Sequence, residues 1–298
     1  MRLHEINEVV DGIFTVAHRV AEGKNVVIMG EREAWAVDTG SDASEGEKMV
    51  ALIRSRGYDP RRLLYTHGHG DHVLGSAPFQ GGDIFAHART PLEIERLLPV
   101  WAQRAGSAID TLRAQIAWPT ITFRDELFLD LGNRQLHLFP TPGHSQDGIS
   151  IYLPEERLLI AGDSVVTGIV PAIGDGDSLV LEASLRKLGA LPIDLLIPGH
   201  GHVVRGQAAV ADWLQWLPDY LGRVRHFVVE SLRQGTAAAA IADRCAFDDF
   251  IGDRLPKEKH KMVKRHEATV NKIVQEWLAA VYENPQNTER TEQTENAT

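Results

Sequence analysis

Short apolar runs alternate with amphipathic segments along the first part of the chain. Period-two patterns predict strands at residues 9–20, 25–30, 33–38, 61–66 and 82–86. Residues 42–57 are predicted to form a helix, because apolar side chains recur there at helical spacing. Asp42 can cap this helix, with Glu45 three residues further on. A short helix is expected to start near residue 71, and residues 90–118 are expected to be mostly helical.

The same alternation returns in the middle of the chain and then gives way to helices. Strands are predicted at residues 121–123, 126–129, 135–140, 148–153, 157–161 and 193–197, with a helix at 178–188. Helices are predicted at residues 207–234 (with a break near Pro218), 236–246 and 259–281. Strands that alternate with helices predict an α/β fold. We expect a domain over residues 1–205, a helical region packed on it over 206–283, and a disordered polar tail over 284–298.

One short stretch concentrates side chains that bind metals well. Directly after the predicted strand at 61–66 come His67, His69, Asp71 and His72, separated by glycines. Imidazole nitrogen and carboxylate oxygen suit zinc, and also iron, manganese and nickel. The glycines interrupt any regular element, so a loop can turn these side chains toward one point. A helix could not, because alternate residues on a helix point to different faces. The alternative is a surface loop that happens to be rich in histidine.

Three later segments repeat this pattern and argue against that alternative. His144, Asp163 and His200 each follow an apolar run and lie beside a glycine. Each is therefore predicted to lie at a strand end that opens into a tight loop. Several loops of this kind, carrying histidine or aspartate, are what a site for two metal ions needs.

Taken together, these motifs resemble the metallo-β-lactamase superfamily. The resemblance covers roughly residues 9–205 and includes Val37-Asp38-Thr39-Gly40 before the histidine-rich loop. It implies a four-layered αββα sandwich with a C-terminal helical appendage. It also implies that one metal ion is held by His67, His69 and His144, that a second is held by Asp71, His72 and His200, and that Asp163 bridges the two ions.

The resemblance further implies a hydrolase that uses two zinc ions per chain. In such a site a hydroxide between the cations attacks an acyl bond, in a thioester, a lactone or another ester. Asp71 is then expected to bind metal and also to take the proton of the nucleophile. Asp38 is expected to orient the histidine-rich loop, although an ordinary turn aspartate would use the same residue type.

Two details of the motifs favour the branch of glyoxalase II and lactonases. Asp163 occupies the bridging position, whose carboxylate the true β-lactamases of this superfamily lack. Position 69 is histidine, where the diiron flavoprotein reductases carry glutamate. The first alternative is a phosphodiesterase or endoribonuclease with the same metal site. An iron-dependent oxygenase, and a metal-binding protein without catalysis, are further alternatives, and iron or manganese could replace zinc.

Composition limits the kinds of binding partner and the cellular compartment that we expect for this protein. The chain has 298 residues, a formal net charge of −10 and one cysteine, Cys245, so it has no intrachain disulfide. The acidic balance argues against a broad nucleic-acid surface. No apolar run reaches the ~18 residues of a membrane span, and residues 1–20 lack the apolar core of a secretory signal. We expect a cytoplasmic enzyme that acts on a small molecule, and a homodimer would suit the family.

The remaining tryptophans and histidines of interest are expected to have structural roles. Trp101 and Trp118 are expected to pack in a core rather than line a pocket. His87 and His137 are expected to lie on strands and not to bind metal. His266, in the last helix, is expected to be structural or solvent-facing. The glycine-rich loop at residues 165–177 is expected to border the pocket, since it follows Asp163.

Overall fold

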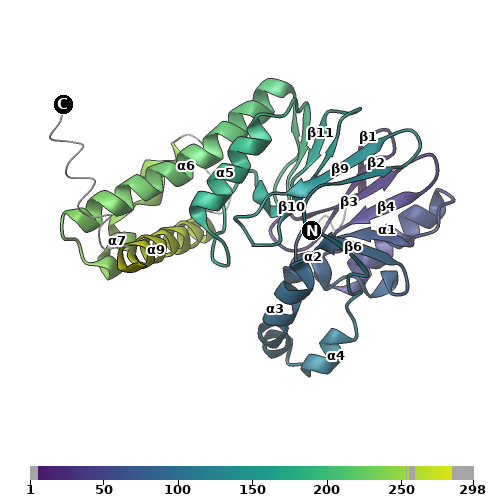
Figure 1. Ribbon diagram of the computed structural model, residues 1–298, viewed down its shortest axis with the longest axis horizontal. Coiled ribbons are helices and arrows are strands. Elements are labelled where there is room, and N and C mark those ends of the chain that lie inside the picture. The colour runs from purple at the N-terminus through teal and green to yellow at the C-terminus, as the bar shows by residue number, and fades with distance from the viewer. Residues whose placement is uncertain (1–5, 253, 255–258, 284–298) are drawn as a thin grey trace.

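The computed structural model describes residues 6–252, 254 and 259–283 (Figure 1). The tail predicted at 284–298 lies outside these residues. The strands are β1 Ile6–Val10, β2 Ile13–Ala17, β3 Lys24–Met29, β4 Ala34–Val37, β5 Arg62–Leu64, β6 Asp83–His87, β7 Ile121–Phe123, β8 Leu127–Asp130, β9 Gln135–Pro140, β10 Ile149–Leu153, β11 Leu158–Ile160, β12 Leu195–Ile197 and β13 Val204–Arg205. The helices are α1 Ala43–Ser55, α2 Gly70–Val73, η1 Ala77–Phe79, α3 Thr90–Ala105, α4 Ile109–Arg113, η2 Gly162–Ser164, α5 Ser178–Gly189, α6 Gln207–Arg233, η3 Ala238–Ala240, α7 Ile241–Arg244, α8 Phe247–Ile251 and α9 Lys259–Glu283.

Two β-sheets face each other at the centre of the described chain. One has the strand order β1-β2-β3-β4-β5-β6-β7 and the other the order β13-β12-β11-β10-β9-β8. Their facing surfaces enclose a core that includes Trp35 and Leu64 from the first sheet and Leu138 and Ile151 from the second. Alternate residues of a strand point to opposite faces of its sheet, so the remaining apolar positions of the same strands face outward and need cover.

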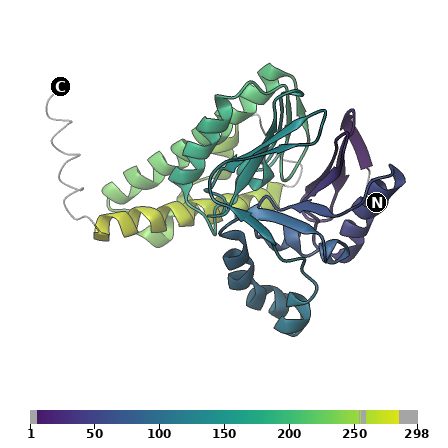
Figure 2. The ribbon, with the colours of Figure 1, turned by 45° about the vertical axis from the view of Figure 1, so that its right-hand side comes forward.

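Helices provide that cover on both outer faces. Met49 of α1 and Leu98 of α3 join a core with Leu63 on the outer face of the first sheet. On the second sheet, α5, α6 and the C-terminal helices pack over a core that contains Leu159 and Leu217. Figure 1 and Figure 2 show the resulting αββα layers, with the C-terminal helices beyond the second sheet. The predicted four-layered sandwich with a C-terminal helical part is therefore confirmed.

Strand direction brings several loops to one edge of this sandwich. Strand β4 pairs in parallel with β5, and β11 with β12. Strand β9 runs in the same direction as β11, because both are antiparallel to β10. Carboxyl ends of strands that run the same way meet at one edge of a sheet. The loops that carry the predicted ligands follow β5, β9, β11 and β12, so each sheet presents its ligands at one edge.

Two expectations about local structure are wrong, and a third holds only for the start of the helix. The strand predicted at residues 9–20 is split into β1 and β2, because Gly12 turns the chain with a φ of +72°. The helix expected from residue 71 ends at Val73, and a separate 3₁₀ turn follows. Helix α6 runs unbroken through Pro218. Proline removes one helical hydrogen bond, but Leu217 and Leu221 beside it are fully buried, and this packing maintains the helix.

The C-terminal helix α9 is tied to the rest of the molecule by specific contacts. The Thr269 hydroxyl donates to the Pro171 carbonyl (3.1 Å), and the backbone N–H of Ser178 donates to the Glu276 carboxylate (3.0 Å). Both partners of α9 lie at or just after the loop at residues 165–177. A domain boundary at residue 205 stays a prediction. Within the described ranges, no helix combines the length and apolar character that crossing a bilayer requires.

Candidate metal centre

The structure brings all seven predicted ligands together at the edge of the two sheets. They come from four loops: His67, His69, Asp71 and His72 after β5, His144 after β9, Asp163 in η2 after β11, and His200 after β12. His69 and Asp71 are half-buried and the other five are buried.

Three imidazoles form the first group. Nδ1 of His69 lies 3.0 Å from Nε2 of His67 and 2.9 Å from Nε2 of His144. A neutral imidazole has one donor nitrogen and one lone pair, so three ring nitrogens at one point cannot all satisfy each other by hydrogen bonds. A cation shared by the three lone pairs satisfies all of them.

Two carboxylates join the other histidines into a second group. Oδ2 of Asp71 lies 3.3 Å from Nε2 of His200, and Oδ1 of Asp71 lies 3.9 Å from Nε2 of His72. Asp163 contacts both groups: its Oδ2 lies 3.4 Å from Nε2 of His144 and 3.3 Å from Nε2 of His200. Its Oδ1 lies 3.4 Å from Nε2 of His72. Asp163 thus lies where a bridging ligand would.

The opposite nitrogen of four imidazoles is engaged by an acceptor outside the cluster. These Nδ1 contacts are to Asp38 Oδ2 for His72 (2.9 Å), the Ala172 carbonyl for His144 (2.7 Å), the Val20 carbonyl for His200 (3.2 Å) and Thr66 Oγ1 for His67 (3.1 Å). Carboxylates and carbonyls only accept hydrogen bonds, so Nδ1 of His72, His144 and His200 carries a proton, and Nε2 is the nitrogen that faces the cluster. The Thr66 hydroxyl donates to Asp38 Oδ2, so its oxygen can accept from Nδ1 of His67 in the same way. Metal-binding histidines are oriented in this way by their outer partners.

Asp38 fixes the start of the histidine-rich loop as well as the His72 ring. Its Oδ1 accepts from the Thr66 backbone N–H (2.8 Å), and its Oδ2 accepts from the Thr66 hydroxyl (2.7 Å). The residue is 2% exposed and has a φ of +57°, a left-handed conformation that aspartate adopts more readily than most residues. The residue at the end of β4 is therefore bonded to the loop that follows β5.

Opposite charges offset one another within the cluster. Burial would raise the pKa of Asp163, but the imidazoles of His200, His72 and His144 lower it well below its usual value. Burial would lower the pKa of His72 and His200, but the facing carboxylates raise it, in His200 to about 9. Burial lowers the pKa of His144 to about 4. Protons on His72 and His200 therefore offset the carboxylates, and a cation can replace these protons.

Two buried atoms without a hydrogen-bond partner, and one glycine that leaves room for a carboxylate, are further features that fit a metal site. Nε2 of His72 and Oδ1 of Asp163 are buried and have no hydrogen-bond partner among the described residues. A Cβ at Gly199 would lie 2.0 Å from Oδ1 of Asp163, so glycine is needed for the carboxylate to reach the centre. Buried polar atoms without partners are rare in native structures. A donor set of imidazole nitrogens and carboxylate oxygens fits divalent cations of the zinc type.

His18 is a member of the cluster that the sequence analysis missed. It is 4% exposed, its ring centroid lies 5.5 Å from that of His200, and its ligand atom groups with those of Asp71 and His200 within 4.8 Å. A Cβ at Gly23 would lie 1.7 Å from Nε2 of His18, so the ring occupies space that only glycine leaves. One feature of the sequence could have identified His18: it directly follows strand β2. This strand runs in the same direction as β4, so both strands end at the same edge of the sheet.

Two further carboxylates support the histidine-rich loop and were also missed. The buried Asp147 accepts from the Gly68 N–H through Oδ2 (2.8 Å). Asp175 places Oδ2 at 3.4 Å from Nε2 of His69, and its Oδ1 accepts from Arg96 (3.2 Å). Asp175 belongs to the glycine-rich loop at residues 165–177, and the structure places that loop beside the cluster.

A pocket of about 390 Å³ opens over these residues. Its lining includes Asp71, Asp163 and His200 from the cluster, Asp175 from the glycine-rich loop, and Arg265 from α9. The side chain of Arg265 is the contribution of the C-terminal region, and no local pattern in the sequence marks it. A molecule of metabolite size can therefore reach the cluster through a mouth bordered by both parts of the chain.

The tryptophans and the remaining histidines predicted to be structural lie outside this pocket lining. Trp101 is buried in the core of the first sheet, and Nε1 of Trp118 donates to the Arg113 carbonyl (3.1 Å). Three histidines bond elsewhere: Nδ1 of His87 accepts from the N–H of Arg89 (3.2 Å), Nε2 of His137 contacts Glu126 (2.9 Å), and Nδ1 of His266 contacts the Tyr220 hydroxyl (2.7 Å).

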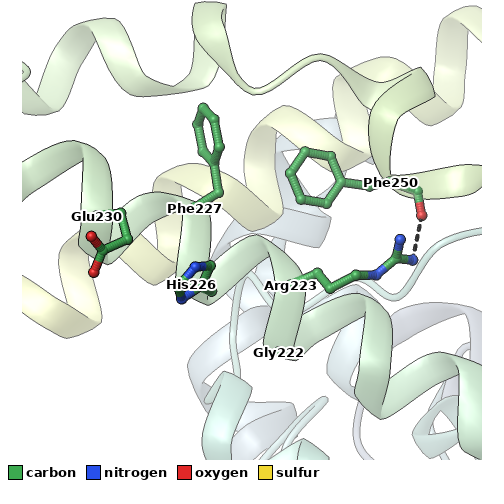
Figure 3. Close-up of a pocket in the computed structure, with 6 residues that line it drawn as sticks. All are labelled: Gly222, Arg223, His226, Phe227, Glu230 and Phe250. Atoms are coloured by element: carbon green, nitrogen blue, oxygen red, sulfur yellow. Dashed lines mark hydrogen bonds between the residues drawn. The ribbon is translucent and has the colours of Figure 1, made fainter. Parts of the chain in front are cut away.

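A separate pocket of about 470 Å³ lies on α6 and α8 (Figure 3). Arg223 crosses it and donates to the Phe250 carbonyl (2.7 Å), while Phe227 and Phe250 supply apolar surface. In the described part of the chain, groups of three metal-binding side chains occur at the sheet edge and not here. The candidate site is therefore the cluster at the sheet edge.

Comparison with known proteins shows the family to which the chain belongs. The sequence profile described as the metallo-beta-lactamase superfamily matches residues 22–200. A linear primary-alkylsulfatase of a Pseudomonas strain is 23% identical over 284 residues, which cover 81% of this chain and 53% of that protein. A hydroxyacylglutathione hydrolase of Cereibacter sphaeroides is 26% identical over 191 residues, 64% of this chain and 62% of that protein. The chain thus spans about half to three fifths of the length of these relatives.

Solved structures show the same fold. A metallo-beta-lactamase family protein of Thermus thermophilus superposes with a TM-score of 0.65 at 20% identity and covers 90% of this chain and 92% of that chain. A double mutant of the sec-alkyl sulfatase PisA1 superposes with a TM-score of 0.68 at 17% identity, over 96% of this chain and 52% of that one. Because the superfamily profile matches more than half of the sequence, the chain belongs to the metallo-β-lactamase superfamily.

Proposed function

We propose that this protein is a metal-dependent hydrolase that cleaves an acyl bond, in a thioester, a lactone or another ester, at a site for two zinc ions. The observation that carries the proposal is the position of Asp163, which contacts three histidines from two groups of predicted ligands at 3.3–3.4 Å. A carboxylate at that point can bridge two cations. The relatives named above are hydrolases by name, which supports the reaction class.

The ligand assignment follows the two groups. His67, His69 and His144 would hold one cation, and Asp71, His72 and His200 the other, with Asp163 between them. When bound, the two cations would lower the pKa of a shared water toward neutrality, so that a hydroxide is available to attack the acyl carbon. Iron or manganese could use the same donors.

Asp71 is the chain's own candidate for moving the proton. It lines the pocket and is half-buried, while its two oxygens face different histidines, His200 and His72. The imidazole of His72 helps to keep the pKa of this carboxyl well below its usual value, although burial acts in the opposite direction. Asp71 is thus ionised and able to accept a proton from a nucleophile beside it. Asp38 orients His72 through its 2.9 Å contact.

Charge in the pocket favours an acyl substrate over a nucleic acid. The lining contains three carboxylates, those of Asp71, Asp163 and Asp175, and one permanent cation, Arg265. A strand of nucleic acid needs several cations along its backbone, and the whole chain carries a formal charge of −10. We therefore assign a small-molecule substrate. The cytoplasmic location and a homodimer stay predictions.

The test is a matched hydrolysis assay on zinc-loaded protein. A thioester and a lactone would be compared with bis-p-nitrophenyl phosphate, a short RNA and a primary alkyl sulfate, and the Asp163→Asn variant would serve as the metal-site control. We expect acyl cleavage that disappears in the variant and after chelation. Cleavage of the phosphodiesters or of the sulfate ester, without acyl cleavage, would overturn the assignment.

A further inference from the structure

The glycine-rich loop at residues 165–177 contacts two of the three histidines of the first ligand group. The Ala172 carbonyl accepts from Nδ1 of His144 (2.7 Å). Three residues further on, Oδ2 of Asp175 lies 3.4 Å from Nε2 of His69. The loop and His144 follow strands of the second sheet, whereas His69 follows β5 of the first sheet. The loop therefore joins ligands that the two sheets supply separately.

His69 faces the cluster with a different nitrogen from the other histidines of its group. Its Nδ1 lies 3.0 Å from Nε2 of His67 and 2.9 Å from Nε2 of His144, so Nδ1 is the atom that would bind the cation. A neutral imidazole that binds through one nitrogen carries its proton on the other. Nε2 of His69 is buried and has no hydrogen-bond partner among the described residues. A buried N–H at this position requires an acceptor.

Asp175 is placed to be that acceptor. The 3.4 Å between its Oδ2 and Nε2 of His69 is a few tenths of an ångström longer than an ordinary N–H···O hydrogen bond. Its other oxygen, Oδ1, accepts from Arg96 of α3 (3.2 Å), which holds the carboxylate beside His69. A Cβ at Gly174, the preceding residue, would meet no atom within 4 Å, so the loop has room for a small shift.

The C-terminal helix α9 anchors this loop on both sides of Asp175. Before it, the Thr269 hydroxyl donates to the Pro171 carbonyl (3.1 Å). After it, the backbone N–H of Ser178 donates to the Glu276 carboxylate (3.0 Å). Fixed ends restrict the shift of the loop to a short range, and they keep the carboxylate oriented before a cation binds.

The second ligand group has a separate outer carboxylate. Asp38, at the end of β4, contacts Nδ1 of His72 at 2.9 Å. In the described part of the chain, Asp175 forms its ion pairs with His69 and Arg96 and with no ligand of the second group. Each group of ligands is thus oriented by its own aspartate, and the two aspartates come from different sheets.

We propose that Asp175 positions His69 for the first cation, which is the one held by His67, His69 and His144. With that cation bound, Nε2–H of His69 donates to Oδ2 of Asp175, and the glycine-rich loop closes onto the first group. The loop and its anchor α9 therefore support the first cation and not the second. This inference rests on the metal site of the proposed function and is independent of the acyl reaction.

The first test measures both zinc affinities by competition with a chelator. Asp175→Asn keeps the size of the side chain and removes its charge, so we expect one affinity to fall by about 10- to 100-fold and the other to stay unchanged. Asp38→Asn should lower the other affinity, and the double variant should lower both. Asp175→Glu should recover part of the loss. Asp110→Asn, whose aspartate side chain is 99% exposed, is the matched control.

A spectroscopic readout tests the contact itself. In cobalt-substituted protein, each histidine ligand contributes one exchangeable N–H signal to the proton magnetic resonance spectrum, shifted by the paramagnetic ion. In Asp175→Asn we expect one of these signals to move and to exchange faster with water, because its acceptor has lost its charge. That signal should stay in place in Asp38→Asn and in Asp110→Asn. Urea unfolding of the metal-free variants verifies that they fold.

The outcomes separate this inference from the proposed function. Wild-type protein that binds no metal would overturn the metal site itself, and the role of Asp175 with it. Two bound zinc ions with affinities that are unchanged in Asp175→Asn would overturn the role of Asp175 and leave the metal site in place. The same conclusion follows if the double variant weakens only one zinc ion, because both aspartates would then act on one cation. These measurements use no substrate, so a lack of acyl hydrolysis does not alter them.

Discussion

Nδ1 of His72 lies 2.9 Å from Oδ2 of Asp38, in a fully buried contact that joins the end of β4 to the histidine-rich loop. The other ring nitrogen of His72 lies 3.4 Å from Oδ1 of Asp163, which follows β11 in the opposite sheet. One imidazole therefore connects both sheets at the candidate metal centre. Its orientation is set by Asp38, which does not itself face the pocket lining.

Replacing Asp38 by asparagine should weaken metal binding without unfolding the protein. Asparagine also tolerates the left-handed backbone conformation, but it lacks the negative charge that supports the His72 N–H. We expect the zinc affinity to fall by about 10- to 100-fold, as for other outer partners of metal-binding histidines. Competition with a chelator measures this affinity, and Asp59→Asn on the surface is the control. An unchanged affinity would show that Asp38 is an ordinary turn residue.

His69→Ala should lose metal and hydrolysis together. His69 faces two histidine nitrogens at 2.9–3.0 Å, so its removal leaves the first group with only two imidazoles. His137→Ala, which removes a histidine on β9 that contacts Glu126, should retain both. Elemental analysis and a thioester assay on the same samples make the comparison. Full activity in His69→Ala would refute the mechanism with two metal ions.

A double-mutant cycle can test how closely His18 fits against Gly23. A Cβ at position 23 would lie 1.7 Å from Nε2 of His18, so Gly23→Ala should destabilise the wild type by about 1–3 kcal/mol through overpacking. In a His18→Ala background the space is free, so Gly23→Ala should lower the free energy of unfolding by much less. Urea unfolding of the four proteins gives the coupling energy. Additive effects would mean that the ring does not occupy this position.

The loops that carry the predicted ligands could be found from the sequence because their determinants are local. Each loop that carries predicted ligands follows an apolar run and contains glycine, and a period of two places that run in a strand. Asp175 and Arg265 could not be found in this way, because they reach the pocket through contacts between segments distant in sequence. The unbroken helix at Pro218 has a similar cause: packing of Leu217 and Leu221 outweighs a local preference.

The helix that carries Arg265 can be tested through its neighbour. His266 is 1% exposed and bonds to Tyr220 and Cys245, so His266→Ala should lower the free energy of unfolding by about 1–3 kcal/mol. Its ring faces the helical core and not the pocket, so turnover per folded molecule, measured well below the melting temperature, should stay near wild type. Loss of turnover with unchanged unfolding energy would place His266 itself at the reaction.

The number and identity of metal ions bound per chain test the central claim most directly. Protein purified without added metal would be analysed by inductively coupled plasma mass spectrometry, beside its Asp163→Asn variant. We predict two zinc ions per wild-type chain and a loss of at least one in the variant, because Asp163 contacts both ligand groups. Wild-type protein that hydrolyses acyl bonds with no bound metal would contradict the account, and iron in place of zinc would favour the oxygenase alternative.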